Sequence, residues 1–347
     1  IQELTPKNIV DALSEEVLYL RHREELILAV LLTFCSPLRI NFNRIDIRGW
    51  LNMIILGDTS TGKCIRGDSL LFTDFGMKKI KDIENFQTEK FLPIQDGLKV
   101  YGLKSPVEPT QTYKSKLAKT IKIKTKLGYV LEGTFNHPIM TLNANNELKF
   151  KMLEEIRLED LAAIQYHQDY FPVFRDSHRM EVPDYFGAIQ EFSLKDFREL
   201  SRFIGYLVGD GEVGSKGEQN YDQNRIRFTN GNKEIIRDYQ RILEKFFDVK
   251  PKAIRDKRSK AISVGFGSQG VRDWLIDFGL LRVKSPEKEI PKKILSLDKA
   301  NIREFLRGVF ETDGFVSKRD VCIGVSSSSR KLIGELRVLL LNFGIIT

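Results

Sequence analysis

The sequence has few of the residues that build metal sites and disulfide bonds. Its 347 residues include only three cysteines, Cys35, Cys64 and Cys322, and four histidines. The cysteines show neither the paired spacing of a zinc site nor the even number of a disulfide framework. This usage is typical of a protein in a reducing compartment, so we expect a cytoplasmic location.

Long apolar stretches are also missing. The longest, residues 26–34, is too short to cross a bilayer and indicates the buried side of a helix. No signal peptide opens the sequence, and we expect no membrane partner. The sequence begins with Ile1 and ends at Thr347 in the middle of a pattern, so both ends look cut from a longer chain.

The sequence does carry an excess of positive charge. Lys and Arg number 55 against 47 Asp and Glu, which gives a net charge of +8. A basic chain favours nucleic acid as a partner, although many basic proteins never bind it. The hydrophobic content of 41% is typical of a globular protein, and the length predicts two or three domains.

The local pattern changes twice along the chain. Residues 1–63 predict helices followed by a strand at 51–56, and the region after Cys64 predicts short strands separated by turns. From about residue 193 the pattern becomes mixed α/β. We therefore expect a multidomain chain with domains at residues 1–63, 64–190 and 191–347.

The predicted strand leads into most of a phosphate-binding loop. In such a loop glycines let backbone N–H groups surround phosphate, and the lysine reaches the outer phosphates. The candidate nucleotide-binding residues are Gly57, Asp58, Thr59, Ser60, Thr61, Gly62 and Lys63. The next residue should be Ser or Thr to bind magnesium, but it is Cys64, a soft ligand that suits this ion poorly. A chance glycine loop is the alternative to a true loop broken after Lys63.

Residues 48–58 resemble the α/β P-loop ATPase module of AAA+ replicative helicases of the minichromosome-maintenance type. The resemblance covers only residues 1–63 and ends before any Walker B acid or arginine finger. The resemblance implies that the protein to which residues 1–63 belong, here called the host, binds ATP and Mg²⁺ and assembles as a helicase oligomer only once its loop is complete. With the loop broken after Lys63, the chain should not hydrolyse ATP.

Two further motifs resemble those of inteins. One starts at Cys64, and the other, about 70 residues later, has a Thr-x-x-His core at Thr134 and His137. Each is weak alone, since a lone cysteine is most often a small buried apolar residue. Together, at the break in the host loop, they imply a mostly-β splicing domain of the Hint type.

Splicing chemistry accounts for these residue types. A thiol is a good nucleophile and leaving group, so Cys64 would attack the Lys63 carbonyl and convert the peptide bond to a thioester. A histidine can protonate the departing nitrogen near neutral pH. By resemblance this is His137, Thr134 holds the scissile peptide, and Asn136 is a further candidate. No cofactor is needed.

The resemblance also implies what must follow Thr347. Inteins of this kind end in His-Asn, followed by a host Ser, Thr or Cys. A Ser or Thr there would be the residue that the phosphate-binding loop lacks. We therefore predict that splicing restores the complete loop.

A repeat occupies the last part of the chain. Residues 203–211 align with 306–314, each with a glycine five residues before an Asp-Gly pair, and a similar strand and helical stripe follow each copy. The best match places residues 226–230 against 322–326. The duplication suggests two halves that straddle duplex DNA.

The repeated segments resemble the LAGLIDADG motif of dodecapeptide homing endonucleases. This implies an α/β domain with two pseudo-symmetric αββαββα-like repeats, the second incomplete. Gly205 and Gly308 would let the motif helices approach. Asp210 and Asp313 would hold Mg²⁺ and support cleavage of double-stranded DNA, namely the host allele that lacks the insert.

Between the two motifs, Lys288 resembles the intein residue that supplies a catalytic lysine, although a solvated surface lysine is the alternative. The basic run at 250–260 would contact DNA phosphates. Two other functions stay open. One is a DNA-binding protein on the LAGLIDADG scaffold that does not cleave, and the other is a P-loop ATPase with an inert insertion.

Overall fold

The computed structural model describes residues 39–42, 45–48, 64–83, 86–94, 97–102, 105–109, 111–116, 119–143, 145–166, 168–214, 225–255, 261–280, 285–319 and 322–347. The candidate phosphate-binding residues 57–63, the predicted strand at 51–56 and Cys35 lie outside these ranges. The fold is mixed α/β with many small antiparallel sheets. In the described ranges, no helix has the length and apolar character needed to cross a bilayer.

The chain divides into two compact units. Unit 1 comprises Ile1–Thr73 and Lys79–Gln165, and unit 2 comprises Asp74–Lys78 and Tyr166–Thr347. Unit 2 thus starts ahead of the predicted boundary at residue 191, because the β14–β15 hairpin packs on a helix of that unit. The functional division at 63 and 190 stays a prediction.

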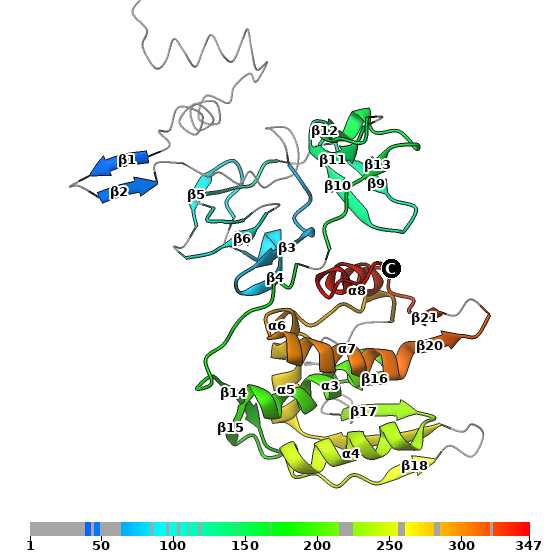
Figure 1. The fold of residues 1–347 in the computed structure, drawn as a ribbon. Coiled ribbons are helices and arrows are strands. Elements are labelled where there is room, and N and C mark those ends of the chain that lie inside the picture. The colour runs from blue at the N-terminus through cyan, green and yellow to red at the C-terminus, as the bar shows by residue number, and fades with distance from the viewer. Residues whose placement is uncertain are drawn as a thin grey trace, which may run out of the picture. The chain divides into compact units, whose positions relative to one another are not determined.

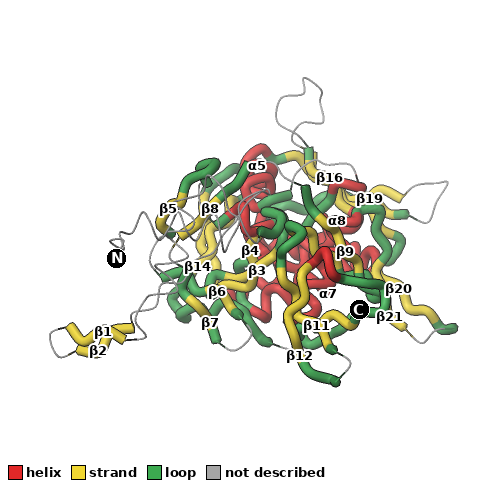
Figure 2. The backbone as a smooth tube through the Cα atoms, turned by 90° about the horizontal axis from the view of Figure 1, so that it is seen from above, coloured by secondary structure: helices red, strands yellow, loops and turns green. Residues whose placement is uncertain are grey.

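Unit 1 is built from short strands joined by turns, shown as yellow segments in Figure 2. Its sheets are β1–β2, β4–β3–β6–β7, β5–β8, β10–β9 and β12–β11–β13. The strands are β1 (Arg39–Phe42), β2 (Ile45–Arg48), β3 (Leu70–Thr73), β4 (Gly76–Lys79), β5 (Phe91–Pro93), β6 (Val100–Tyr101), β7 (Pro106–Val107), β8 (Gln111–Tyr113), β9 (Ile121–Lys124), β10 (Val130–Gly133), β11 (Pro138–Leu142), β12 (Leu148–Met152) and β13 (Leu161–Ala162). The 3-10 turns are η2 (Ile80–Asp82) and η3 (Leu153–Glu155).

In the described residues of unit 1, one small apolar cluster is buried. Ile94, Leu98 and Val100 form one buried cluster, and partly buried apolar side chains pack around it. Burying such a side chain contributes about 1.5–3 kcal/mol.

Unit 2 holds the helices of the described chain. Its elements are β14 (Arg179–Pro183), β15 (Ile189–Ser193), α3 (Leu194–Asp210), β16 (Gly211–Val213), β17 (Arg225–Asn230), α4 (Lys233–Phe247), β18 (Ala253–Arg255), β19 (Ile262–Gly267), α5 (Gln269–Phe278), η4 (Ser285–Glu287), α6 (Lys292–Leu295), α7 (Lys299–Asp313), β20 (Gly314–Ser317), β21 (Cys322–Val325) and α8 (Arg330–Asn342). Strands β16–β17–β19–β18 form one sheet and β20–β21 another.

The predicted duplication is visible in the order of elements. In one copy α3, β16, β17 and α4 follow each other, and in the other α7, β20, β21 and α8 do (Figure 1). The strand register corrects the alignment of the copies by one residue. Gly211 pairs with Phe228, whereas the equivalent Gly314 pairs with Val325. Ile226 therefore corresponds to Ile323, and not to Cys322.

Helices α3 and α7 lie against each other at two glycines. A β-carbon added at Gly205 would lie 2.3 Å from the Phe305 carbonyl oxygen, and one at Gly308 would lie 2.3 Å from the Arg202 carbonyl oxygen. Any larger residue at either position would push the backbones apart. The close approach that the repeated motif implies is therefore present.

Aromatic side chains fill the space between α3, α4 and the first sheet. Phe203 and Phe228 stack on the two sides of Tyr239, with ring centroids 5.1 Å and 4.6 Å away. All three side chains are fully buried. This core holds α3 rigidly, and therefore fixes the position of its last residue, Asp210.

Candidate functional site

Cys64 lies in a short antiparallel contact with the strand that precedes Thr134. The Cys64 amide donates to the Thr134 hydroxyl at 3.1 Å, and the Thr134 amide donates to the Cys64 carbonyl at 2.9 Å. A bridge between Ile65 and Gly133 continues this pairing. Cys64 has no exposed surface and Thr134 only 6%. The structure thus brings together the first residue of one motif and the threonine of the other.

A tight turn returns the chain from Thr134 to His137. The His137 amide donates to the Thr134 carbonyl at 2.9 Å, and the Thr134 hydroxyl lies 2.8 Å from Asn136 Oδ1. A β-carbon at Gly133 would lie 2.8 Å from the Cys64 carbonyl oxygen and 3.3 Å from the His137 β-carbon. Only glycine at position 133 therefore leaves room for both the Cys64 backbone and the His137 side chain.

Asp210 and Asp313 are the last residues of α3 and α7. Burial raises the pKa of both carboxyls, and the negative charge of Asp210 raises that of Asp313 further. The two carboxylates are therefore close enough to repel each other. This is the arrangement in which a divalent cation is most favourable.

Lys288 lies with both acids. Burial lowers the pKa of its ammonium group, and the charges of Asp313 and Asp210 oppose this effect. Its Nζ donates to the Gly209 carbonyl, next to Asp210, and its own carbonyl accepts the Ser329 hydroxyl at 2.6 Å. Lys288 is thus a half-buried charge held between the motif helices and the start of α8, and not a solvated surface lysine.

Asn230, at the end of β17, was not predicted from the sequence. Its amide nitrogen donates to Asp210 Oδ2 at 2.7 Å, which opposes the effect of burial on the pKa of that carboxyl. The only signal in the sequence was a polar residue at the end of the strand that follows the Asp-Gly pair. Its partner becomes clear only from the register of β16 and β17.

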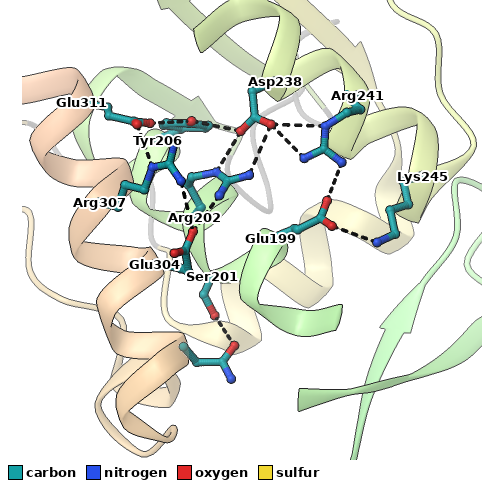
Figure 3. A network of polar contacts seen from close by, with 11 residues as sticks. Glu199, Ser201, Arg202, Tyr206, Asp238, Arg241, Lys245, Glu304, Arg307 and Glu311 are labelled. Atoms are coloured by element: carbon teal, nitrogen blue, oxygen red, sulfur yellow. Dashed lines mark hydrogen bonds and ion pairs between the residues drawn. The ribbon is translucent and has the colours of Figure 1, made fainter. Parts of the chain in front are cut away.

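A charged network joins α3, α4 and α7 (Figure 3). Arg202 donates to Asp238 at 2.8 Å and to Glu304 at 2.6 Å, and the Tyr206 hydroxyl lies 3.0 Å from Asp238 and 2.7 Å from Glu311. Burial alone would raise the pKa of Asp238, but hydrogen bonds from Arg241 and Arg202 hold it below its usual value. The network ties the two repeats together through polar contacts.

Among the described residues, no group of three or more His, Cys, Asp or Glu side chains could hold a metal ion. Asp210 and Asp313 are therefore at most part of a ligand set. Magnesium sites often consist of one or two carboxylates completed by water and substrate phosphate, and this pair fits that pattern. Of the basic run, residues 256–260 lie outside the described ranges, and Lys250 pairs with Glu244 at 2.6 Å.

Comparison with known proteins shows that part of unit 2 is similar to one family. Residues 198–264 and 300–347 match the family model described as LAGLIDADG-like domain. These two ranges contain most of both motif helices and the strands that follow them. Among solved structures, I-DmoI in complex with DNA and calcium is similar with a TM-score of 0.33 and 14% identity, over 43% of this chain and 73% of that one.

The curated relatives are proteins of different kinds. The replication factor C small subunit of Methanocaldococcus jannaschii is 28% identical over 304 residues, 85% of this chain but 15% of that protein. The glutamine–fructose-6-phosphate aminotransferase of the same organism is 24% identical over 57% of this chain and 17% of that protein. The chain thus spans less than a third of the relatives it matches. A match to a small part of otherwise unrelated proteins is what an intein-like insert produces, and in this chain the insert carries a LAGLIDADG-like domain.

Proposed function

We propose that the chain contains a self-splicing intein with an embedded homing endonuclease, and that the intein interrupts the phosphate-binding loop of an ATPase. The observation that carries the proposal is the meeting of Asp210, Asp313 and Lys288 where the two motif helices end. The contact between Cys64 and Thr134 supports the splicing part. Unit 1 from Cys64 onward would serve splicing, and unit 2 would cleave DNA.

In the first splicing step, Cys64 Sγ would form a bond to the Lys63 carbonyl carbon, and the bond from that carbon to the Cys64 nitrogen would break. A base takes the proton from the thiol, and His137 donates a proton to the departing nitrogen. Thr134 accepts the amide hydrogen of Cys64 and so fixes the plane of this peptide. The complete burial of Cys64 would limit the access of water to its sulfur.

In DNA cleavage, water adds to phosphorus, one phosphorus–oxygen bond breaks, and a proton ends on the leaving oxygen. Asp210 and Asp313 would hold Mg²⁺, which when bound supplies positive charge for the attacking and leaving oxygens. Lys288 would orient water or phosphate beside them. Because the motif helices are related by pseudo-symmetry, each acid would serve one DNA strand.

The host part is proposed from the sequence alone. Residues 57–63 would bind ATP and Mg²⁺ once splicing has placed a Ser or Thr after Lys63. The host would then act as a helicase oligomer. Because a replication factor C small subunit is among the relatives, the ATPase family of the host stays open.

The splicing proposal is tested on the full-length precursor, extended beyond Thr347 to the end of the gene. Intact-mass spectrometry should find ligated host protein and excised insert. Cys64→Ala should abolish both products. Thr134→Ala should slow them while Thr134→Ser retains most of the rate, since Ser keeps the hydroxyl. A wild-type precursor that never changes mass would contradict the splicing proposal.

The endonuclease proposal is tested on a plasmid that carries the host gene without the insert. The full chain should linearise this plasmid with Mg²⁺ and leave it intact with EDTA. Asp210→Asn and Asp313→Asn should each prevent linearisation while DNA binding persists. Binding without any cutting by the wild-type chain would instead support the non-cleaving DNA-binding protein.

A further inference from the structure

The two acids have different surroundings, although the helices that carry them are repeats. Asn230 donates to Asp210 Oδ2 at 2.7 Å. In the described part of the chain, no side chain donates a hydrogen bond to the Asp313 carboxylate. The difference arises from the residue at the end of β17 and its counterpart just after β21.

The strand register identifies the counterpart of Asn230. With Gly211 opposite Phe228 and Gly314 opposite Val325, Asn230 corresponds to Ser327. The two residues make the same local turn. Asn230 Oδ1 accepts the amide of Asn232 at 2.8 Å, and Ser327 Oγ accepts the amide of Ser329 at 3.2 Å. Asn232 and Ser329 in turn cap α4 and α8.

Asn230 has a second function that Ser327 cannot perform. Its oxygen is held by the turn, so its amide nitrogen is aimed at Asp210 without further loss of side-chain freedom. A serine in the same turn uses its hydroxyl oxygen there and has no amide group to extend. Asn230, at the end of β17, therefore fixes the Asp210 carboxylate in one orientation. Within the described ranges, the Asp313 carboxylate has no such side-chain donor.

We infer that Asn230 is a positioning residue for one of the two strand cleavages, and that the two strands are cut at unequal rates. The inference rests on the proposed endonuclease function and deepens it. The strand served by the Asp210 site is cut first, because its carboxylate is already oriented. The second cut follows from a nicked intermediate.

The test compares Asn230→Ser with Ser327→Ala on target DNA labelled differently on each strand. Asn230→Ser gives the first repeat the residue found in the second and preserves the turn, so it removes only the contact with Asp210. It should slow the strand that wild type cuts first by about 10-fold, the size of effect typical of groups that orient a ligand. The rate on the other strand, the DNA affinity without Mg²⁺ and the melting temperature should stay unchanged.

Ser327→Ala is the matched control, since it changes the equivalent turn without touching an acid contact, and both strand rates should stay as in wild type. Asn230→Ser overturns the inference if it leaves both strand rates unchanged, slows both equally, or slows the strand that wild type cuts second. A wild-type chain that binds its target but cuts neither strand would defeat the proposed endonuclease function, and the inference would fall with it.

Discussion

Gly308 lies where the backbones of α7 and α3 come closest, and its substitution is the sharpest test of this packing. A β-carbon there would lie 2.3 Å from the Arg202 carbonyl oxygen and 3.0 Å from the Gly205 α-carbon. The obstacle is backbone in both directions, so rotamer changes cannot relieve it. We expect Gly308→Ala to lower the free energy of unfolding by about 3 kcal/mol, measured by urea denaturation.

Gly334 in α8 provides the control. It is exposed, and a β-carbon there would meet nothing within 4 Å. Glycine is about 0.5–1 kcal/mol less favourable than alanine in a helix interior, so Gly334→Ala should raise the unfolding free energy by this amount. Equal effects of the two substitutions would contradict the close helix contact.

Tyr239 carries a hydroxyl group into the core of unit 2. Its side chain is fully buried between Phe203 and Phe228, and in the described ranges no group hydrogen-bonds to the hydroxyl. Burying a polar group without a partner is unfavourable. Tyr239→Phe should therefore leave thermal stability unchanged or raise the unfolding free energy by up to about 1 kcal/mol. A loss of more than this would reveal a partner for the hydroxyl.

At the scale of elements, the charged network joins α3, α4 and α7, and Arg202 is its centre. The Arg202 side chain is 11% exposed, and it pairs with Asp238 and Glu304. Removing it takes the nearest cation from the poorly solvated Glu304 carboxylate and leaves Asp238 with Arg241 as its cationic partner. We expect Arg202→Met to lower the unfolding free energy by about 3 kcal/mol in a denaturant titration at neutral pH.

Arg241 is the matched control within the same network. It also pairs with Asp238 and Glu199, but its side chain is 50% exposed. Exposed ion pairs contribute about 1 kcal/mol or less, so Arg241→Met should have a small effect. If both substitutions destabilise equally, burial is not what gives Arg202 its importance.

The same network sets part of the acid sensitivity. Burial alone would raise the pKa of Asp238 and Glu199, but their hydrogen bonds to basic side chains hold both below the usual range. Because the folded pKa is lower than the unfolded one, the resulting stability is present above about pH 4 and is lost as pH falls through the folded pKa. Urea titrations from pH 6 to pH 3 should show a steeper loss for wild type than for Asp238→Asn. Parallel curves would contradict this contribution.

The sequence was most informative where the repeat imposes a backbone requirement. The resemblance of the repeat to the LAGLIDADG motif pointed to the glycines at 205 and 308 and the acids at 210 and 313, and the structure has them at the helix contact and at the helix ends. Asn230 could not be predicted, because its contact with Asp210 depends on the pairing register of β16 and β17. A one-residue error in aligning the repeats was enough to hide its counterpart, Ser327.

At the scale of the whole molecule, the chain carries two compact units with different interiors. Among the described residues, most of the largest fully buried side chains belong to unit 2, whereas unit 1 contributes Ile80 and Leu153 to that set. Stability is therefore distributed unevenly, since local opening is easiest where few apolar contacts are buried. The amides of α3 and α7 should exchange with solvent most slowly, and those of the β11–β12 hairpin faster.

Hydrogen exchange followed by mass spectrometry can show whether the units open separately. In Gly308→Ala the clash lies inside unit 2, so protection should fall in α3 and α7 and stay unchanged in β11 and β12. Independent opening would let the residues around Cys64 keep their arrangement even when the helix pair is weakened. An equal loss of protection in β11 and β12 would show instead that the two units unfold as one cooperative body.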